Sequence, residues 1–159
     1  MSKRNLCYCE AALRVTGLFV LHLVLYVCYI FIMTINANTT SRIFKTAWFS
    51  KAAKKARISD EELCSALHQV MQGQADDLGG GVFKKRLNDN RHRSIIIAKG
   101  GKYRIYTYLF AKKDRSNIDT DELAEFKKLA ALYSRQTDVT INAQIKNGDL
   151  VEICHAKQA

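Results

Sequence analysis

The pattern of apolar and polar residues predicts a strand, two helices, at least three strands and then more helices after residue 41. The strongest strand signal lies between Gly81 and Lys113, where three runs rich in β-branched and aromatic residues are separated by Asn-Asp-Asn and Gly-Gly turn signals. These runs are VFKKRL, RSIIIAK and KYRIYTYLF. A shorter strand-like run covers residues 42–45, and residues 150–154 supply a candidate edge strand.

The segments around this sheet have the spacing of amphipathic helices. Apolar residues recur at helical spacing from Trp48 to Ala56 opposite a lysine-rich face, and we interpret Trp48 as a core residue. Residues 59–62 read as a capping box for a second helix, which we expect to form a hairpin with the first. Capping signals at 117–122 and 137–138 predict two more helices.

Residues 1–41 differ from the rest of the chain, so we divide it into an N-terminal hydrophobic segment, 1–41, and a domain, 42–159. Residues 15–41 contain no Lys, Arg, Asp or Glu, and their apolar run is long enough to cross a hydrocarbon core, which needs about 20 residues. This pattern predicts a transmembrane helix. The alternative is that translation starts at Met33 and that the preceding residues are an upstream extension. A secretory signal peptide is disfavoured because the apolar run is too long.

Charge narrows the possible partners. The chain has a net charge of +10, and ten Lys or Arg side chains lie between Gly81 and Lys113 against one acid, Asp89. A sheet with this charge is expected to meet nucleic acid, an anionic membrane surface or an acidic protein. The five cysteines are scattered and odd in number, which predicts free thiols in a reducing compartment. We expect no metal site and no cofactor.

Four segments, in order, carry a resemblance to a known family: RIFKTAWFSKAAKKARISDEELCSA, DLGGGVFKKR, YLFAKKDRSNIDTDELAEFKKLA and NGDLVEIC. They resemble the RelE/ParE superfamily of toxins from type II toxin-antitoxin systems, in particular its longer RelE-like members. The resemblance implies an α+β domain in which a helical hairpin and C-terminal helices pack on one face of an antiparallel sheet. It also implies an endoribonuclease that cleaves messenger RNA at the ribosome and is restrained by an antitoxin.

Metal-free RNA cleavage lets the 2′-hydroxyl attack the adjacent phosphate, so a site must supply a base, cations and an acid for the leaving oxygen. By resemblance, Arg93 matches the family's arginine at the start of a strand, and its planar guanidinium can bind two phosphate oxygens. His92 is a candidate general base because neighbouring cations favour its neutral form. Lys85 and Lys113 complete the candidate catalytic set. The candidate RNA-binding residues are Lys84, Arg86, Arg91 and Lys112.

Three further patterns bear on this site. Strand alternation places Lys84 and Arg86 on one sheet face and Lys85 on the other. Three tyrosines, 103, 106 and 108, are candidates for stacking on bases, with core packing as the alternative. The link from Leu87 to His92 is shorter than the Gly- and Lys-rich loop that the related toxins carry. The resemblance therefore specifies the position of an RNA-facing groove on the basic sheet better than it specifies the catalytic residues.

The expected partners are a cognate antitoxin, messenger RNA and the ribosome, in the cytoplasm. Membrane contact through residues 15–35 is expected if the hydrophobic segment is retained. Two other function classes stay open at this stage. One is a non-enzymatic inhibitor of a protein target such as gyrase, in the manner of ParE. The other is a membrane-tethered basic domain that binds nucleic acid or acidic lipid.

Overall fold

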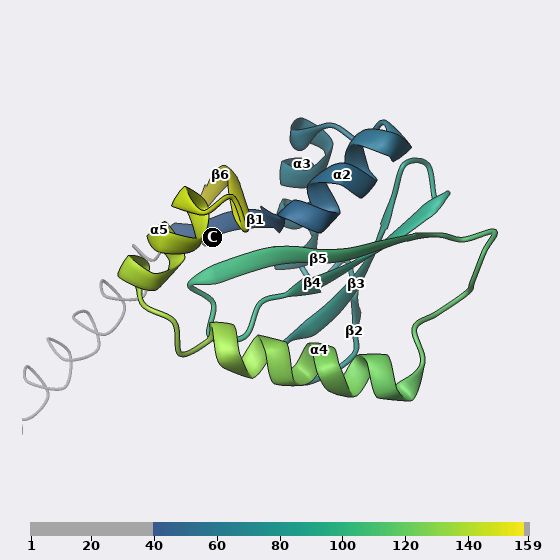
Figure 1. Ribbon diagram of the computed structural model, residues 1–159. Coiled ribbons are helices and arrows are strands. Elements are labelled where there is room, and N and C mark those ends of the chain that lie inside the picture. The colour runs from purple at the N-terminus through teal and green to yellow at the C-terminus, as the bar shows by residue number, and fades with distance from the viewer. Residues whose placement is uncertain (1–39, 158–159) are drawn as a thin grey trace, which may run out of the picture. The chain divides into compact units, whose positions relative to one another are not determined.

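A six-stranded sheet organises residues 40–157, the part of the chain that this computed structural model describes (Figure 1). The strands are β1 (Thr40–Thr46), β2 (Asp76–Asp77), β3 (Val82–Leu87), β4 (His92–Ile97), β5 (Tyr103–Ala111) and β6 (Leu150–Lys157). Their spatial order is β2-β3-β4-β5-β1-β6. The expected α+β class is confirmed. The sheet is mixed, because β1 runs parallel to β5 while the other neighbouring pairs are antiparallel.

Helices cover both faces of the sheet. The helices α2 (Ala47–Ala56) and α3 (Asp60–Met71) pack on one face, and α4 (Thr120–Tyr133) and α5 (Asp138–Lys146) pack on the other. The consecutive isoleucines of β4 explain this arrangement: Ile96 is buried on the α2–α3 side, and Ile95 and Ile97 on the α4 side. A strand that is apolar on both faces needs a cover on each. The expectation of helices on one face alone is therefore wrong.

The helix starts follow the predicted caps, with one difference that matters later. The Ser59 hydroxyl accepts a hydrogen bond from Glu62 N at 3.2 Å, as expected for the start of α3. The Glu62 carboxylate, however, accepts from Asn88 N at 2.7 Å, so it anchors the β3–β4 hairpin to α3. A complete capping box forms at α4, between Asp119 and Glu122.

A disulfide joins Cys64 of α3 to Cys154 of β6, with their Cα atoms 6.4 Å apart. This pairing contradicts the expectation that these two cysteines are free thiols. The two cysteines are 90 residues apart, so no local pattern in the sequence indicates that they pair. The disulfide forms because α3 packs beside β6. The other three cysteines and the expected N-terminal hydrophobic helix lie outside the described residues. Within residues 40–157, no helix is both long and apolar enough to span a membrane.

Replacing both Cys64 and Cys154 by Ser is expected to lower the free energy of unfolding by about 2–4 kcal/mol, because the cross-link restrains the unfolded chain. Denaturant unfolding of the full-length protein with and without a thiol reductant measures this difference. Reduction should bring the wild type to the stability of the double variant, which serves as the control because reductant leaves it unchanged. Equal stability of the oxidised and reduced wild type would count against the bond.

Candidate functional site

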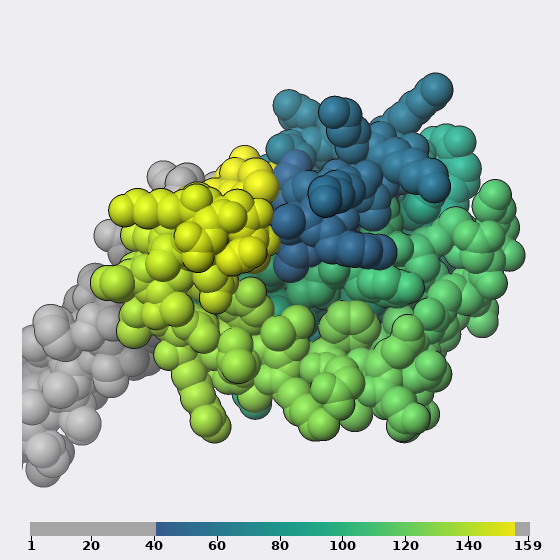
Figure 2. All heavy atoms as spheres, in the orientation of Figure 1, coloured from purple at the N-terminus to yellow at the C-terminus, as the bar shows by residue number. Residues whose placement is uncertain are grey.

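A groove lies between α2 and the end of β5. The pairing of β5 with β1 ends at Tyr106, but β5 continues to Ala111. Two adjoining hollows, of about 710 and 770 Å³, follow this part of β5, which pairs with β4 but not with β1. They share the lining residues Lys55, Ala56, His92, Ala111 and Lys113. Figure 2 shows side chains of α2 and of the segment between β5 and α4 on the same face of the molecule. We call the combined hollow the α2–β5 groove.

The α2–β5 groove is cationic. Its lining contains only two acids, Asp89 and Asp114, against a much larger set of Lys and Arg side chains. These cations are Lys51, Lys55, Arg57, Arg91, Lys112, Lys113 and Arg115. Among residues 40–157, Lys51, Lys55 and Lys113 have no ion-pair partner, so their charge is available to an anionic ligand.

His92 lines both hollows, and its hydrogen bonds define its tautomer. The Asn88 side-chain nitrogen donates to His92 Nδ1 at 3.2 Å and to Ala56 O at 3.1 Å. The Ala56 carbonyl oxygen can only accept, so it sets the orientation of the Asn88 amide, and the amide nitrogen can then only donate to Nδ1. Because Nδ1 accepts, the neutral ring carries its hydrogen on Nε2. In this tautomer His92 offers a ligand a hydrogen-bond donor at Nε2, and its expected role as a general base stays a prediction.

The short link between β3 and β4 is a tight hairpin. Asn88, Asp89 and Asn90 all have positive φ angles, of 52°, 49° and 67°, in the left-handed region that Asn and Asp tolerate better than most residues. Arg91 N donates to Asn88 O at 3.0 Å and closes the turn. The contact between Asn88 N and Glu62 fastens the hairpin to α3. The link thus supplies one end wall of the groove.

Arg93 lies outside the groove. In the register of the sheet it stands opposite Arg86 and Phe110, on the α4 side, and it is only 7% exposed. Its Nη1 donates to Asn90 O at 3.1 Å and to His92 O at 3.0 Å. The guanidinium therefore supports the hairpin backbone, and the structure does not bring it to the place where His92 lies.

The basic residues of β3 border a separate hollow beside residues 73–76. Alternation holds as predicted: Lys84 Nζ donates to Asn117 Oδ1 at 3.3 Å near α4, and Lys85 Nζ donates to Gln74 O at 2.7 Å near α3. Burial, and then the charge of Arg86, lower the pKa of Lys85. The predicted site residues therefore lie in three places: the α2–β5 groove, the hollow beside β3 and, for Arg93, the α4 side of the sheet. Those that the α2–β5 groove brings together are Arg91, His92, Lys112 and Lys113.

Trp48 forms an aromatic wall at the other end of the groove. It is 51% exposed, so the interpretation of Trp48 as a core residue is wrong. Its indole stacks on the Tyr108 ring, with centroids 4.9 Å apart and an interplanar angle of 18°. Of the three tyrosines considered for base stacking, Tyr103 and Tyr106 are buried and only Tyr108 reaches the groove.

Sequence reasoning missed several groove residues. Lys51 and Lys55 were visible as the lysine-rich face of α2, but nothing in the sequence placed that face beside β5. Arg115 is positioned by Glu122 of α4, with Arg115 Nη1 donating to Glu122 Oε1 at 2.9 Å. This bond and the backbone hydrogen bond from Asp119 lower the pKa of Glu122 to about 2. Within residues 40–157, no three His, Cys, Asp or Glu side chains gather as metal ligands.

Comparison with known proteins identifies the family of this chain. Residues 41–153 match the family described as the RelE toxin of the RelE/RelB toxin-antitoxin system. The match covers well over half of the chain, so the protein belongs to this family. It is the toxin component of a toxin-antitoxin system, and the family implies an antitoxin as its partner. No curated protein and no solved structure matches the chain.

The lowered pKa of Glu122 predicts that its contribution to the free energy of unfolding depends on pH. Its pKa falls from 4.5 to about 2 on folding, so its stabilising effect is present above about pH 4.5 and is lost as the pH falls through 2. Unfolding free energies of the wild type and Glu122→Gln, measured from pH 7 to pH 2, should differ at neutral pH and converge at the acid end. A difference that stays constant with pH would show that the Glu122 charge does not stabilise the fold.

Asn88→Gly keeps the left-handed backbone available and removes the amide that holds His92 Nδ1. We expect the fraction of the Nε2–H tautomer to fall, because the donor to Nδ1 is lost. The ¹⁵N chemical shifts of the His92 ring measure this fraction directly. Asn90→Gly, at a neighbouring left-handed position, is the matched control and should leave the His92 shifts unchanged. Identical shifts in Asn88→Gly and the wild type would contradict the assignment.

Proposed function

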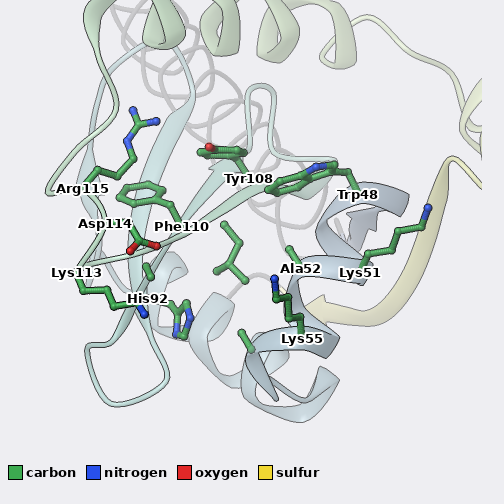
Figure 3. Close-up of a pocket in the computed structure, with 13 residues that line it drawn as sticks. Trp48, Lys51, Ala52, Lys55, His92, Tyr108, Phe110, Lys113, Asp114 and Arg115 are labelled. Carbon is green, nitrogen blue, oxygen red and sulfur yellow. The ribbon is translucent and has the colours of Figure 1, made fainter.

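We propose that this toxin is a metal-independent endoribonuclease that cleaves messenger RNA at the ribosome, with the scissile phosphate bound in the α2–β5 groove. The observation that carries the proposal is the convergence of Lys55, His92 and Lys113 from three separate elements on one groove (Figure 3). Unpaired cations and a hydrogen-bond donor around one hollow form a site for a phosphate whose negative charge increases in the transition state.

Each chemical role has a candidate in this hollow. Asp114 is the carboxylate that lines it and is our candidate to accept the proton of the 2′-hydroxyl. The 2′-oxygen then forms a bond to phosphorus while the bond to the 5′-oxygen breaks, which leaves a 2′,3′-cyclic phosphate. Lys113 can give a proton to the leaving 5′-oxygen. Lys55 and the Nε2–H of His92 stabilise the non-bridging oxygens.

We infer that the protein acts in the cytoplasm, where ribosomes are found. The division of the chain at residue 41, the transmembrane helix and membrane contact through residues 15–35 stay predictions. The RNA-binding role of Arg91 and Lys112 is supported by their place in the groove. The catalytic roles first expected for Arg93 and Lys85 are not part of this proposal, because neither lines the α2–β5 groove.

Induced expression without an antitoxin tests this function, both of the full-length chain and of a version that starts at Met33. We expect growth arrest and cleaved transcripts whose upstream fragments end in a 2′,3′-cyclic phosphate. The double variant Lys55→Ala with Lys113→Ala should lose cleavage by about 100-fold or more, since each removed donor weakens transition-state stabilisation. The double variant Lys54→Ala with Lys146→Ala removes the same charge at exposed positions outside the groove and should cleave normally.

Growth arrest with intact transcripts would contradict the proposed nuclease. If that arrest came with a DNA-damage response, it would point to the alternative class, a non-enzymatic inhibitor of gyrase. Equal loss of cleavage in the groove variant and in the control variant would show that overall charge, and not this site, supports the activity.

A further inference from the structure

Trp48 is an exposed aromatic residue on a helix whose neighbouring positions are deeply buried. Phe49 and Ala53 fasten α2 to the sheet and are 0% and 2% exposed, whereas Trp48 is 51% exposed. Trp48 is the only tryptophan in the chain. A large indole left half in water forgoes much of the stabilisation that burial would bring, so burial in the core does not explain its presence here.

The indole is nevertheless held in place. One of its faces lies on Tyr108, and the Tyr108 ring is itself in contact with Phe110 and Phe126, each with its centroid 6.0 Å away. Phe126 belongs to α4 and Trp48 to α2, so the aromatic stack connects the two helical layers past the point where the pairing of β5 with β1 ends. A ring supported on one face and half exposed is a preorganised surface for another flat ring.

Positive charge lies next to this surface on the same helix face. Trp48, Lys51 and Lys55 are separated by intervals of three and four residues, and all of them line the same hollow. Trp48 and Lys55 are about 10 Å apart along the helix axis, a span that a short stretch of RNA backbone bridges. Figure 3 shows Trp48 at one end of the hollow and His92 with Lys113 toward the other.

An aromatic platform beside unpaired cations matches the chemistry of single-stranded nucleic acid, in which an unpaired base can stack while its phosphate meets the cations. An acidic peptide would use the cations but has no need of a flat aromatic surface. In a duplex the bases are already stacked on one another and cannot lie on an indole without being flipped out.

We propose that Trp48 is a positioning residue that stacks on an unpaired nucleobase of the RNA, next to the phosphate held by Lys55 and Lys113. This inference rests on the proposed function, because it concerns the same groove. Stacking uses the face that every base has, so Trp48 selects for single-stranded RNA and not for a particular base. The choice of cleavage site then depends on which part of the message is unpaired and accessible.

The intrinsic fluorescence of the full-length protein tests this inference, since Trp48 is its only tryptophan. The probe is a short single-stranded RNA with 2′-O-methyl groups, which bears no 2′-hydroxyl and so is not cleaved. We expect this strand to quench the fluorescence on binding. An abasic strand of the same length and charge, and the duplex form of the RNA, should bind without comparable quenching.

Affinity measurements on two Trp48 variants complete the test. Trp48→Ala should weaken binding of the single-stranded RNA by about 10-fold and leave binding of the abasic strand unchanged. Trp48→Phe keeps an aromatic face and should restore most of the lost affinity. Far-UV circular dichroism checks that both variants fold. If Trp48→Ala does not fold, the comparison of wild type and Trp48→Phe on base-containing and abasic strands still decides the matter.

Cleavage of unmodified RNA, measured on the same samples, separates this inference from the proposed function. Cleavage together with unquenched fluorescence and equal affinity of Trp48→Ala would overturn the stacking role and leave the nuclease in place. Quenching by single-stranded RNA without any cleavage would support stacking and contradict the nuclease. Quenching by the purified antitoxin and not by RNA would assign the exposed indole face to the protein partner and overturn the inference.

Discussion

The three consecutive isoleucines of β4 are almost completely buried, and they point alternately to the two faces of the sheet. This burial requires a helical layer on each face, because the apolar area that they remove from water is a large part of the driving force for folding. The layer on the Ile96 side brings Phe49 and Ala53 of α2 down onto the sheet. The opposite edge of α2 is thereby set beside the end of β5, where the groove forms.

The groove itself arises because β5 extends beyond the end of its parallel partner, β1. The chain leaves β1 directly into α2. The hairpin between β3 and β4 closes one end, where Asn88 contacts Glu62 of α3, Ala56 of α2 and His92 of β4. A site whose walls are tied together in this way keeps its donors and cations in place before a ligand arrives, and such preorganisation favours electrostatic stabilisation of a transition state.

Cations gather at the groove, where seven Lys or Arg side chains line the two hollows against two acids. Ion pairs occur both at the groove, as in Arg91–Asp89 and Arg115–Glu122, and elsewhere in the described part of the chain, as in Arg42–Glu152 and Lys102–Asp138. Among the described residues, Lys51, Lys55 and Lys113 line the groove without an ion-pair partner. The positive charge of the sequence thus becomes a localised field, which attracts an anionic ligand to one place.

The sequence by itself determined the kinds of element, most of their limits and the family. Runs of β-branched and aromatic residues specified the strands, and caps such as Asp119 and Glu122 specified where helices begin, because both are local signals. It also determined the neighbourhood of the site, since the hairpin and the basic residues after β5 lie within the stretch from Gly81 to Lys113.

Only the tertiary structure decided which residues of that neighbourhood meet. Alternation along a strand shows that His92 and Arg93 point to opposite faces, but it does not show which face carries α2. Likewise, helical spacing groups Trp48 with Lys51 and Lys55 without showing whether that face is buried or lines a groove. The disulfide between Cys64 and Cys154 likewise depends on the packing of α3 against β6, which are far apart in the chain. Periodicity within an element records which side chains share a face, whereas the packing of elements far apart in the chain decides what that face contacts.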